Sequence, residues 1–231
     1  MLEYRLRVSR WARGITLRVT EDARLEVIAP RRIGPRTVAR LFRAHHDWIA
    51  TTMQDAAFRY SPAVPSLPAE VILPAIRGRW TITRARTSAR GVRALADSQE
   101  IALTGQVTDA AACRRALRRW LVARAWDHLP VLLEQASRAH GLPYGRCAVR
   151  LTRSQWGCCY RSGLISLSAR LLFLPPAVTE YVLIHELCHT LEQNHSHAFW
   201  HIVARHCPEY TLRRVELRSL GKTIPAWVVA R

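Results

Sequence analysis

Tyr181–Trp200 reads YVLIHELCHTLEQNHSHAFW, and this segment carries the most informative motif of the chain. His185, Glu186 and His189 form the pattern HExxH, in which two histidines stand four residues apart. Four residues of an α-helix advance about 400°, so both imidazoles point the same way and can bind one metal ion. The glutamate lies about 60° away from the second histidine, which lets it reach a water on that ion without being a ligand. The pattern therefore predicts a helix that carries a metal site.

A catalytic zinc site needs a third protein ligand, and His195 is the first imidazole after the pattern. On an unbroken helix His195 would be rotated by about 600° from His189, away from the other ligands. We therefore expect the helix to end or turn at Gln193 and Asn194, because asparagine tolerates the left-handed conformation. The same histidine spacing occurs in the metzincin pattern HExxHxxGxxH, but Glu192 stands where that pattern has its glycine, which argues against a metzincin.

Core histidines without a metal are the alternative interpretation. The pattern lies inside an apolar run formed by Val182, Leu183, Ile184, Leu187 and Leu191. Burying two histidines and a glutamate among such side chains costs several kcal/mol unless they are coordinated or paired. The context therefore favours the metal site.

Composition indicates a globular protein. The chain has 231 residues, of which 49% are hydrophobic and eight are tryptophan, enough for a substantial core. No run of about 18 or more uncharged apolar residues occurs, and the N-terminal MLEYRLRVSRW resembles no cleaved leader. The six cysteines show no CxxC pair, which is typical of reduced thiols. We expect a cytoplasmic protein without a membrane partner.

The formal net charge of +18 comes almost entirely from arginine, since Lys222 is the sole lysine. Such a charge attracts polyanions, so DNA or another polyanion is a candidate partner for an arginine-rich surface. An arginine bias is equally typical of a GC-rich coding sequence. Arg114, Arg115, Arg118 and Arg119 form one stripe on an expected helix, either a basic surface for a partner or an ordinary solvated face.

The first part of the chain reads as mostly β. Alternating apolar residues predict a β-meander over 2–29, and a helical pattern runs from about 35 to 58. Three prolines within 62–68 predict a stiff connector. Four further strands are expected at about 70–76, 79–86, 91–96 and 99–104.

A long helix to about His140 follows, with Thr108-Asp109 as its expected N-cap, an expected break at Pro130 and a stop at Gly141. A strand at about 148–152 and a hairpin turning at Gly163 come next.

Pro175 and Pro176 suit the first turn of the metal-binding helix. Ser196 can cap a further helix ending near Cys207, and a last helix is expected at about 209–220.

Five segments of the second half occur in an order known from one family: QWGCC at 155–159, LISL at 164–167, PP at 175–176, HELCH at 185–189 and NHSHAFW at 194–200. In this order the chain resembles the YgjP-like zinc metallopeptidases, bacterial relatives of the SprT-like proteases within the zincin group. The resemblance is specific over 153–208 and looser before about 105. It implies an α+β fold, with a zincin-like metallopeptidase domain over 106–231 preceded by a β-rich part with one helix over 1–105.

The resemblance implies that His185, His189 and His195 bind Zn²⁺ and that Glu186 is the general base for a metal-activated water. The implied activity is hydrolysis of peptide bonds in a peptide or protein substrate. As the SprT relatives imply, the alternative is a nucleic-acid-associated protease acting on DNA-bound proteins. A structural zinc module is a third interpretation, which the intact Glu186 argues against, because a closed site needs four ligands and no base.

Two residues depart from the family pattern. Gln155 and Cys158 stand where an arginine and a serine are usual, which leaves the hairpin's role in substrate binding open. Cys158 or Cys159 is an alternative zinc ligand, or both simply pack beside the helix. Four residues are candidates for stabilising an oxyanion or orienting a ligand, and a purely structural role fits each equally: His197, His201, Tyr160 and Tyr181.

Overall fold

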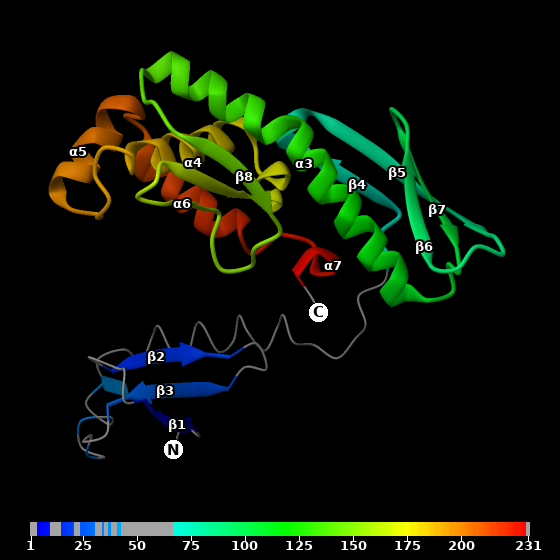
Figure 1. Ribbon diagram of the computed structural model, residues 1–231, viewed down its shortest axis with the longest axis horizontal. Coiled ribbons are helices and arrows are strands. Elements are labelled where there is room, and N and C mark those ends of the chain that lie inside the picture. Colours follow the sequence, from blue (N-terminus) through cyan, green and yellow to red (C-terminus); the bar gives the residue numbers. More distant parts are fainter. Residues whose placement is uncertain are drawn as a thin grey trace. The chain divides into compact units, whose positions relative to one another are not determined.

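The structure, a computed structural model, describes residues 4–9, 15–20, 24–30, 34, 37, 41–42 and 67–229 (Figure 1). By its internal contacts the chain divides into two compact units, one of residues 1–65 with 230–231 and one of residues 66–229. The strands between 70 and 105 fall in the same unit as the later helices. The expected division into a β-rich part over 1–105 and a metallopeptidase domain over 106–231 stays a prediction. Most of the connector expected at 62–68 lies outside the described residues.

The smaller unit contains a three-stranded sheet of β1 (Tyr4–Val8), β2 (Thr16–Val19) and β3 (Leu25–Ala29). The strand order is β1-β3-β2, with β1 parallel and β2 antiparallel to β3. The three strands are confirmed, but the expected meander is wrong, because a meander pairs consecutive strands. Alternation of side chains fixes the buried face of a strand and not its neighbour. The helix expected over 35–58 lies largely outside the described residues.

The larger unit begins with a four-stranded sheet of β4 (Glu70–Leu73), β5 (Gly78–Arg86), β6 (Val92–Ala96) and β7 (Glu100–Gly105). The order is β4-β5-β7-β6, in which β5 and β7 are parallel and the two outer pairs are antiparallel. These are the four strands that the sequence predicts. The first of them is shorter than expected, because Pro74–Ile76 forms a short 3-10 helix, η1.

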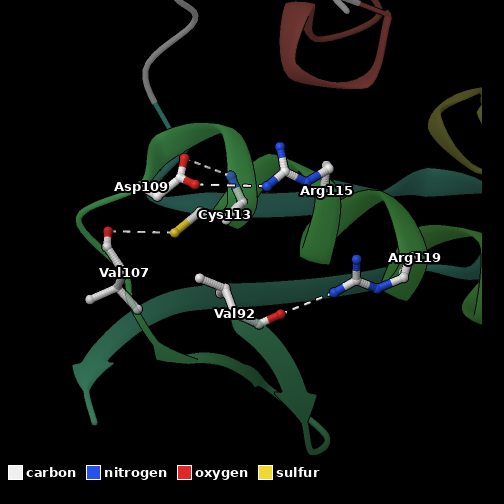
Figure 2. A network of polar contacts seen from close by, with 7 residues as sticks. Val92, Val107, Asp109, Cys113, Arg115 and Arg119 are labelled. Carbon is white, nitrogen blue, oxygen red and sulfur yellow. Dashed lines mark hydrogen bonds and ion pairs between the residues drawn. The ribbon is translucent and has the colours of Figure 1, made fainter. Parts of the chain in front are cut away.

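One helix, α3 (Ala110–His140), connects the two sheets of the larger unit by packing on strands of both (Figure 1). Its start is fixed by Asp109, whose carboxylate accepts a hydrogen bond from the Ala112 N–H at 2.9 Å and lies 3.7 Å from the Arg115 guanidinium (Figure 2). Its end is fixed by Gly141, which adopts a left-handed conformation with φ of 65°. Both helix ends are confirmed as predicted.

The expected break at Pro130 is wrong, because α3 continues through it. Proline removes one backbone hydrogen bond and disfavours a helix interior. Leu129 and Leu133, on either side of it, are fully buried, so packing on both sides of Pro130 holds the helix together.

The four arginines of the expected stripe on α3 divide between internal contacts and the surface. Arg119 donates a hydrogen bond to the Val92 carbonyl at 3.0 Å (Figure 2), and Arg118 Nε donates to the Trp227 carbonyl at 2.8 Å. Arg114 is buried. Arg118 and Arg119 thus tie α3 to its neighbours, while Arg115 and Arg119 are still exposed to solvent.

After α3 comes a second sheet of β8 (Arg146–Arg150), β9 (Gly157–Cys159) and β10 (Leu164–Ser168). The order is β8-β10-β9, with β8 parallel and β9 antiparallel to β10, so β9 is an edge strand. Gly163, with φ of 76°, makes the hairpin turn between β9 and β10, as predicted.

Four helices complete the larger unit: α4 (Pro176–Cys188), α5 (His197–His206), α6 (Tyr210–Leu220) and α7 (Ala226–Val229). Helix α4 packs on α3, α5, α6 and β9, which places it at the centre of the unit. The chain is therefore α+β, with strands in the N-terminal half and helices after them, as expected. None of the six cysteines forms a disulfide. In the described part of the chain, no helix combines the length and apolarity needed to cross a membrane.

Candidate metal centre

The HExxH segment lies in the last turn of α4. The helix ends at Cys188, and His189 is its C-cap with φ of −67° and ψ of −13°, so the two histidines keep their helical spacing. The chain then turns over 189–191, earlier than the expected turn at Gln193 and Asn194. Asn194 has no positive φ. The helix does end before His195, but it ends through backbone bonds within this turn and not through a left-handed asparagine.

The structure brings His185, His189 and His195 together. Their ligand atoms all lie within 4.8 Å of one another, and Nε2 of His185 is 3.1 Å from Nε2 of His195. Two Zn–N bonds of about 2.0–2.1 Å at a tetrahedral angle place their nitrogens roughly 3.3 Å apart. The two imidazoles are therefore spaced as ligands of one zinc ion, and the residues fit the metal.

His189 is oriented by its surroundings. Its Nδ1 lies 3.0 Å from the carbonyl oxygen of Glu192. A carbonyl only accepts, so Nδ1 carries the proton and Nε2 keeps its lone pair for a metal. The ring also stacks on buried Phe199, with centroids 4.2 Å apart and planes 19° from parallel. Hydrogen bond and stack together fix the tautomer and the orientation of this ligand.

The buried environment keeps His185 neutral. Burial lowers the pKa of His185 to about 3, and the neighbouring His189 and His195 act in the same direction. Burial likewise lowers the pKa of His189. Metal ions bind the neutral imidazole, so no proton competes for these nitrogens at neutral pH.

Glu186 lies beside the three histidines and outside the ligand group. Its side chain is only 6% exposed and packs against β9, where a Cβ on Gly157 would come within 2.5 Å of its Cγ. Burial raises the pKa of Glu186 to about 7, partly opposed by a hydrogen bond from the Cys159 backbone. A carboxyl group with a pKa near neutrality can both accept and return a proton.

A cavity of about 380 Å³ opens over this group. Strand β9 and the two residues before it form one wall. Helix α4 and the turn that follows it form the other. The lining residues are Gln155, Trp156, Gly157, Cys158, Cys159, Tyr181, Val182, His185, Glu186, His189, Gln193, His195 and Leu217. The three histidines and Glu186 therefore line one cavity together.

Of the four further candidates, only Tyr181 lines this cavity. Its ring centroid lies 5.9 Å from that of His185, and burial raises the pKa of Tyr181 to about 12, so its hydroxyl stays protonated. His197 and His201 are exposed on α5, Tyr160 is 48% exposed, and none of the three lines the cavity. The structure therefore places one of the four candidates, Tyr181, at the cavity.

Cys158 and Cys159 line the cavity but are not grouped with the histidines. Within residues 67–229, the metal-binding group that includes His185 contains no cysteine. Burial raises the pKa of both thiols, which disfavours the thiolate that binds zinc. The geometry does not support either cysteine as a ligand.

Helix α6 adds residues that the sequence does not indicate. The Arg214 guanidinium carbon lies 4.5 Å from the centroid of the Trp200 ring. Trp200 stacks on His195, with centroids 5.6 Å apart, and on Tyr210, with centroids 5.4 Å apart. The contact of Arg214 with Trp200 joins α6 to α5, which both pack on α4, and no local pattern reveals it.

The comparison with family models points to one family. The family model described as "YgjP-like, metallopeptidase domain" matches residues 13–220. Among solved structures, the chain is similar to the crystal structure of the metallopeptidase zymogen of Pyrococcus abyssi abylysin. The two are 25% identical over 41% of this chain and 93% of that chain, with a TM-score of 0.36. No curated protein matches the chain.

Proposed function

The chain belongs to the YgjP-like metallopeptidase family, and on that premise we propose that it hydrolyses peptide bonds with zinc as the metal and Glu186 as the general base. The observation that carries the proposal is the grouping of three imidazoles within 4.8 Å beside a buried carboxyl group. A structural zinc site would need a fourth ligand and no base.

We assign His185, His189 and His195 as the zinc ligands. A zinc ion bound there supplies a Lewis acid that lowers the pKa of its water and polarises a carbonyl group. The Glu192 carbonyl holds the proton on Nδ1 of His189, so that its Nε2 faces the metal position. Stacking on Phe199 and Trp200 restricts rotation of His189 and His195. The ligands are thus held in place before the metal arrives.

Glu186 accepts the proton of the attacking water and returns it to the leaving amine. Its pKa of about 7 supports both transfers, because such a group is neither too acidic to take a proton nor too basic to release it. Gly157 and the Cys159 backbone keep the carboxyl group against β9. We assign Tyr181, with its protonated hydroxyl, as a hydrogen-bond donor to the charge that develops on the substrate oxygen.

The proposal is tested on purified protein by its metal content and by hydrolysis of an unstructured protein such as casein. One zinc per chain is expected, with activity abolished by a chelator and restored by zinc. Undiminished hydrolysis after complete removal of the metal contradicts the proposal.

The alternative, a protease that acts on DNA-bound proteins, stays a prediction. Of the arginine stripe on α3, Arg114 is buried and Arg118 donates to the Trp227 carbonyl, which leaves Arg115 and Arg119 exposed for such a partner. A DNA affinity that falls steeply with salt supports the alternative, and no binding at low salt removes it.

A further inference from the structure

A second cavity adjoins the metal centre on the side of α6. Its volume is about 610 Å³, and it shares five lining residues with the first cavity: Trp156, Tyr181, His185, His195 and Leu217. Arg214 and Arg218 line the second cavity and not the first. The shared walls include two of the proposed metal ligands, so the two arginines line a cavity that is continuous with the metal position.

The charge of the two arginines is unmatched. Arg214 and Arg218 stand four residues apart on α6, one helical turn, and therefore face the same side. Among the described residues, neither guanidinium has an ion-pair or hydrogen-bond partner, and no residue lining the cavity is acidic. The adjacent Arg213 differs, since it pairs with both Glu209 and Glu216.

Trp200 positions one of these arginines relative to the metal ligands. The guanidinium carbon of Arg214 lies 4.5 Å from the Trp200 ring centroid, and the same ring stacks on His195. A guanidinium group stacked on an indole keeps the N–H groups along its edge available for hydrogen bonds in its own plane. Arg214 is therefore held one aromatic ring away from a metal ligand, with its donors unused.

We propose that Arg214 and Arg218 form a carboxylate-binding subsite, so that the preferred substrate carries a carboxylate close to the bond that is cut. This rests on the proposed peptidase function. Guanidinium groups bind carboxylates through paired, charge-assisted hydrogen bonds, and the cavity offers no competing acid. This carboxylate belongs either to the side chain of an Asp or Glu of the substrate or to the substrate's C-terminus.

The test measures peptide binding separately from hydrolysis. Zinc-loaded Glu186→Gln protein is titrated with short fluorescent peptides, acetylated and amidated, in which one Glu is moved through every position. A matched series carries Gln in place of Glu, and a third series has a free C-terminal carboxylate and no acidic side chain. A preference for the Glu series identifies a side-chain site, and a preference for the third series identifies a chain-end site.

We expect one carboxylate series to bind about 10- to 100-fold more tightly than its neutral match. Adding Arg214→Gln and Arg218→Gln together should abolish the preference while zinc content and thermal midpoint stay unchanged. The control is Arg205→Gln, which changes an exposed arginine of α5 outside both cavities. This variant should keep the preference for carboxylate peptides.

Equal binding of acidic and neutral peptides, no peptide binding at all, or a preference that survives the double substitution would each overturn the subsite. Failure of the wild-type protein to hydrolyse any peptide would instead overturn the proposed function, since binding is measured independently.

Discussion

Gly157 on β9 and Glu186 on α4 are in such close contact that a Cβ at position 157 would lie 2.5 Å from Cγ and 2.6 Å from Cδ of the glutamate. The edge strand and the central helix therefore meet at a point where only glycine fits. This contact, and not the HExxH pattern alone, sets where the carboxyl group stands in the cavity.

Gly157→Ala should displace Glu186 and lower the rate of hydrolysis while the protein still binds zinc. Overpacking a filled site costs roughly 1–3 kcal/mol in the free energy of unfolding. The measurement is zinc content, hydrolysis rate and chemical unfolding of the same preparation. Gly34→Ala is the control, because among the described residues a Cβ there meets nothing within 4 Å. An unchanged rate for Gly157→Ala would mean that the close contact does not position the base.

Replacing any one of His185, His189 and His195 by Ala should lower zinc affinity by orders of magnitude, because only two protein ligands remain. Competition with a chromogenic chelator measures the affinity. His201→Ala is the matched control, since this histidine is exposed and lines neither cavity. Full zinc occupancy in His195→Ala would place the third ligand elsewhere.

Phe199→Leu should weaken zinc binding roughly 10- to 100-fold, the range found when a group that orients a metal ligand is lost. Leucine keeps the site filled with apolar atoms but cannot stack on His189. Val203→Ala, at another fully buried position of α5, separates stability from metal binding. It should lower the thermal midpoint and leave zinc affinity unchanged. Equal zinc affinities for Phe199→Leu and wild type would show that the stack does not orient His189.

Pro130→Ala should raise the free energy of unfolding by about 1–3 kcal/mol, because α3 is continuous there and alanine restores the missing backbone N–H. Urea unfolding measures the change. Hydrolysis should be unaffected, since Pro130 lines neither cavity. A destabilised variant would mean that the lost packing of the proline ring outweighs the regained helical hydrogen bond.

The features that the sequence predicts correctly depend on neighbours along the chain. Asp109 and Gly141 bound α3 through backbone bonds within one turn, and Gly163 makes the hairpin by its own positive φ. The imidazoles of His185 and His189 converge because helical spacing fixes their directions. Each of these is decided within a few residues, so the local pattern is sufficient.

The features that the sequence misses depend on contacts between distant segments. The pairing of β1 with β3 is not contained in the alternation of either strand. The stack of Arg214 on Trp200 arises only when α6 docks beside α4. The close approach of Gly157 to Glu186 likewise joins a strand and a helix that are separate in sequence. Tertiary packing decides all three.

In the proposed mechanism Glu186 takes a proton from water and is not a metal ligand. Glu186→Gln tests this most directly. Glutamine keeps the size of the buried side chain but cannot accept the proton. The measurement is zinc content together with the rate of casein hydrolysis, for variant and wild type side by side. We predict full zinc occupancy and a rate lower by about 10²–10⁴. A wild-type rate, or loss of zinc, would contradict the account.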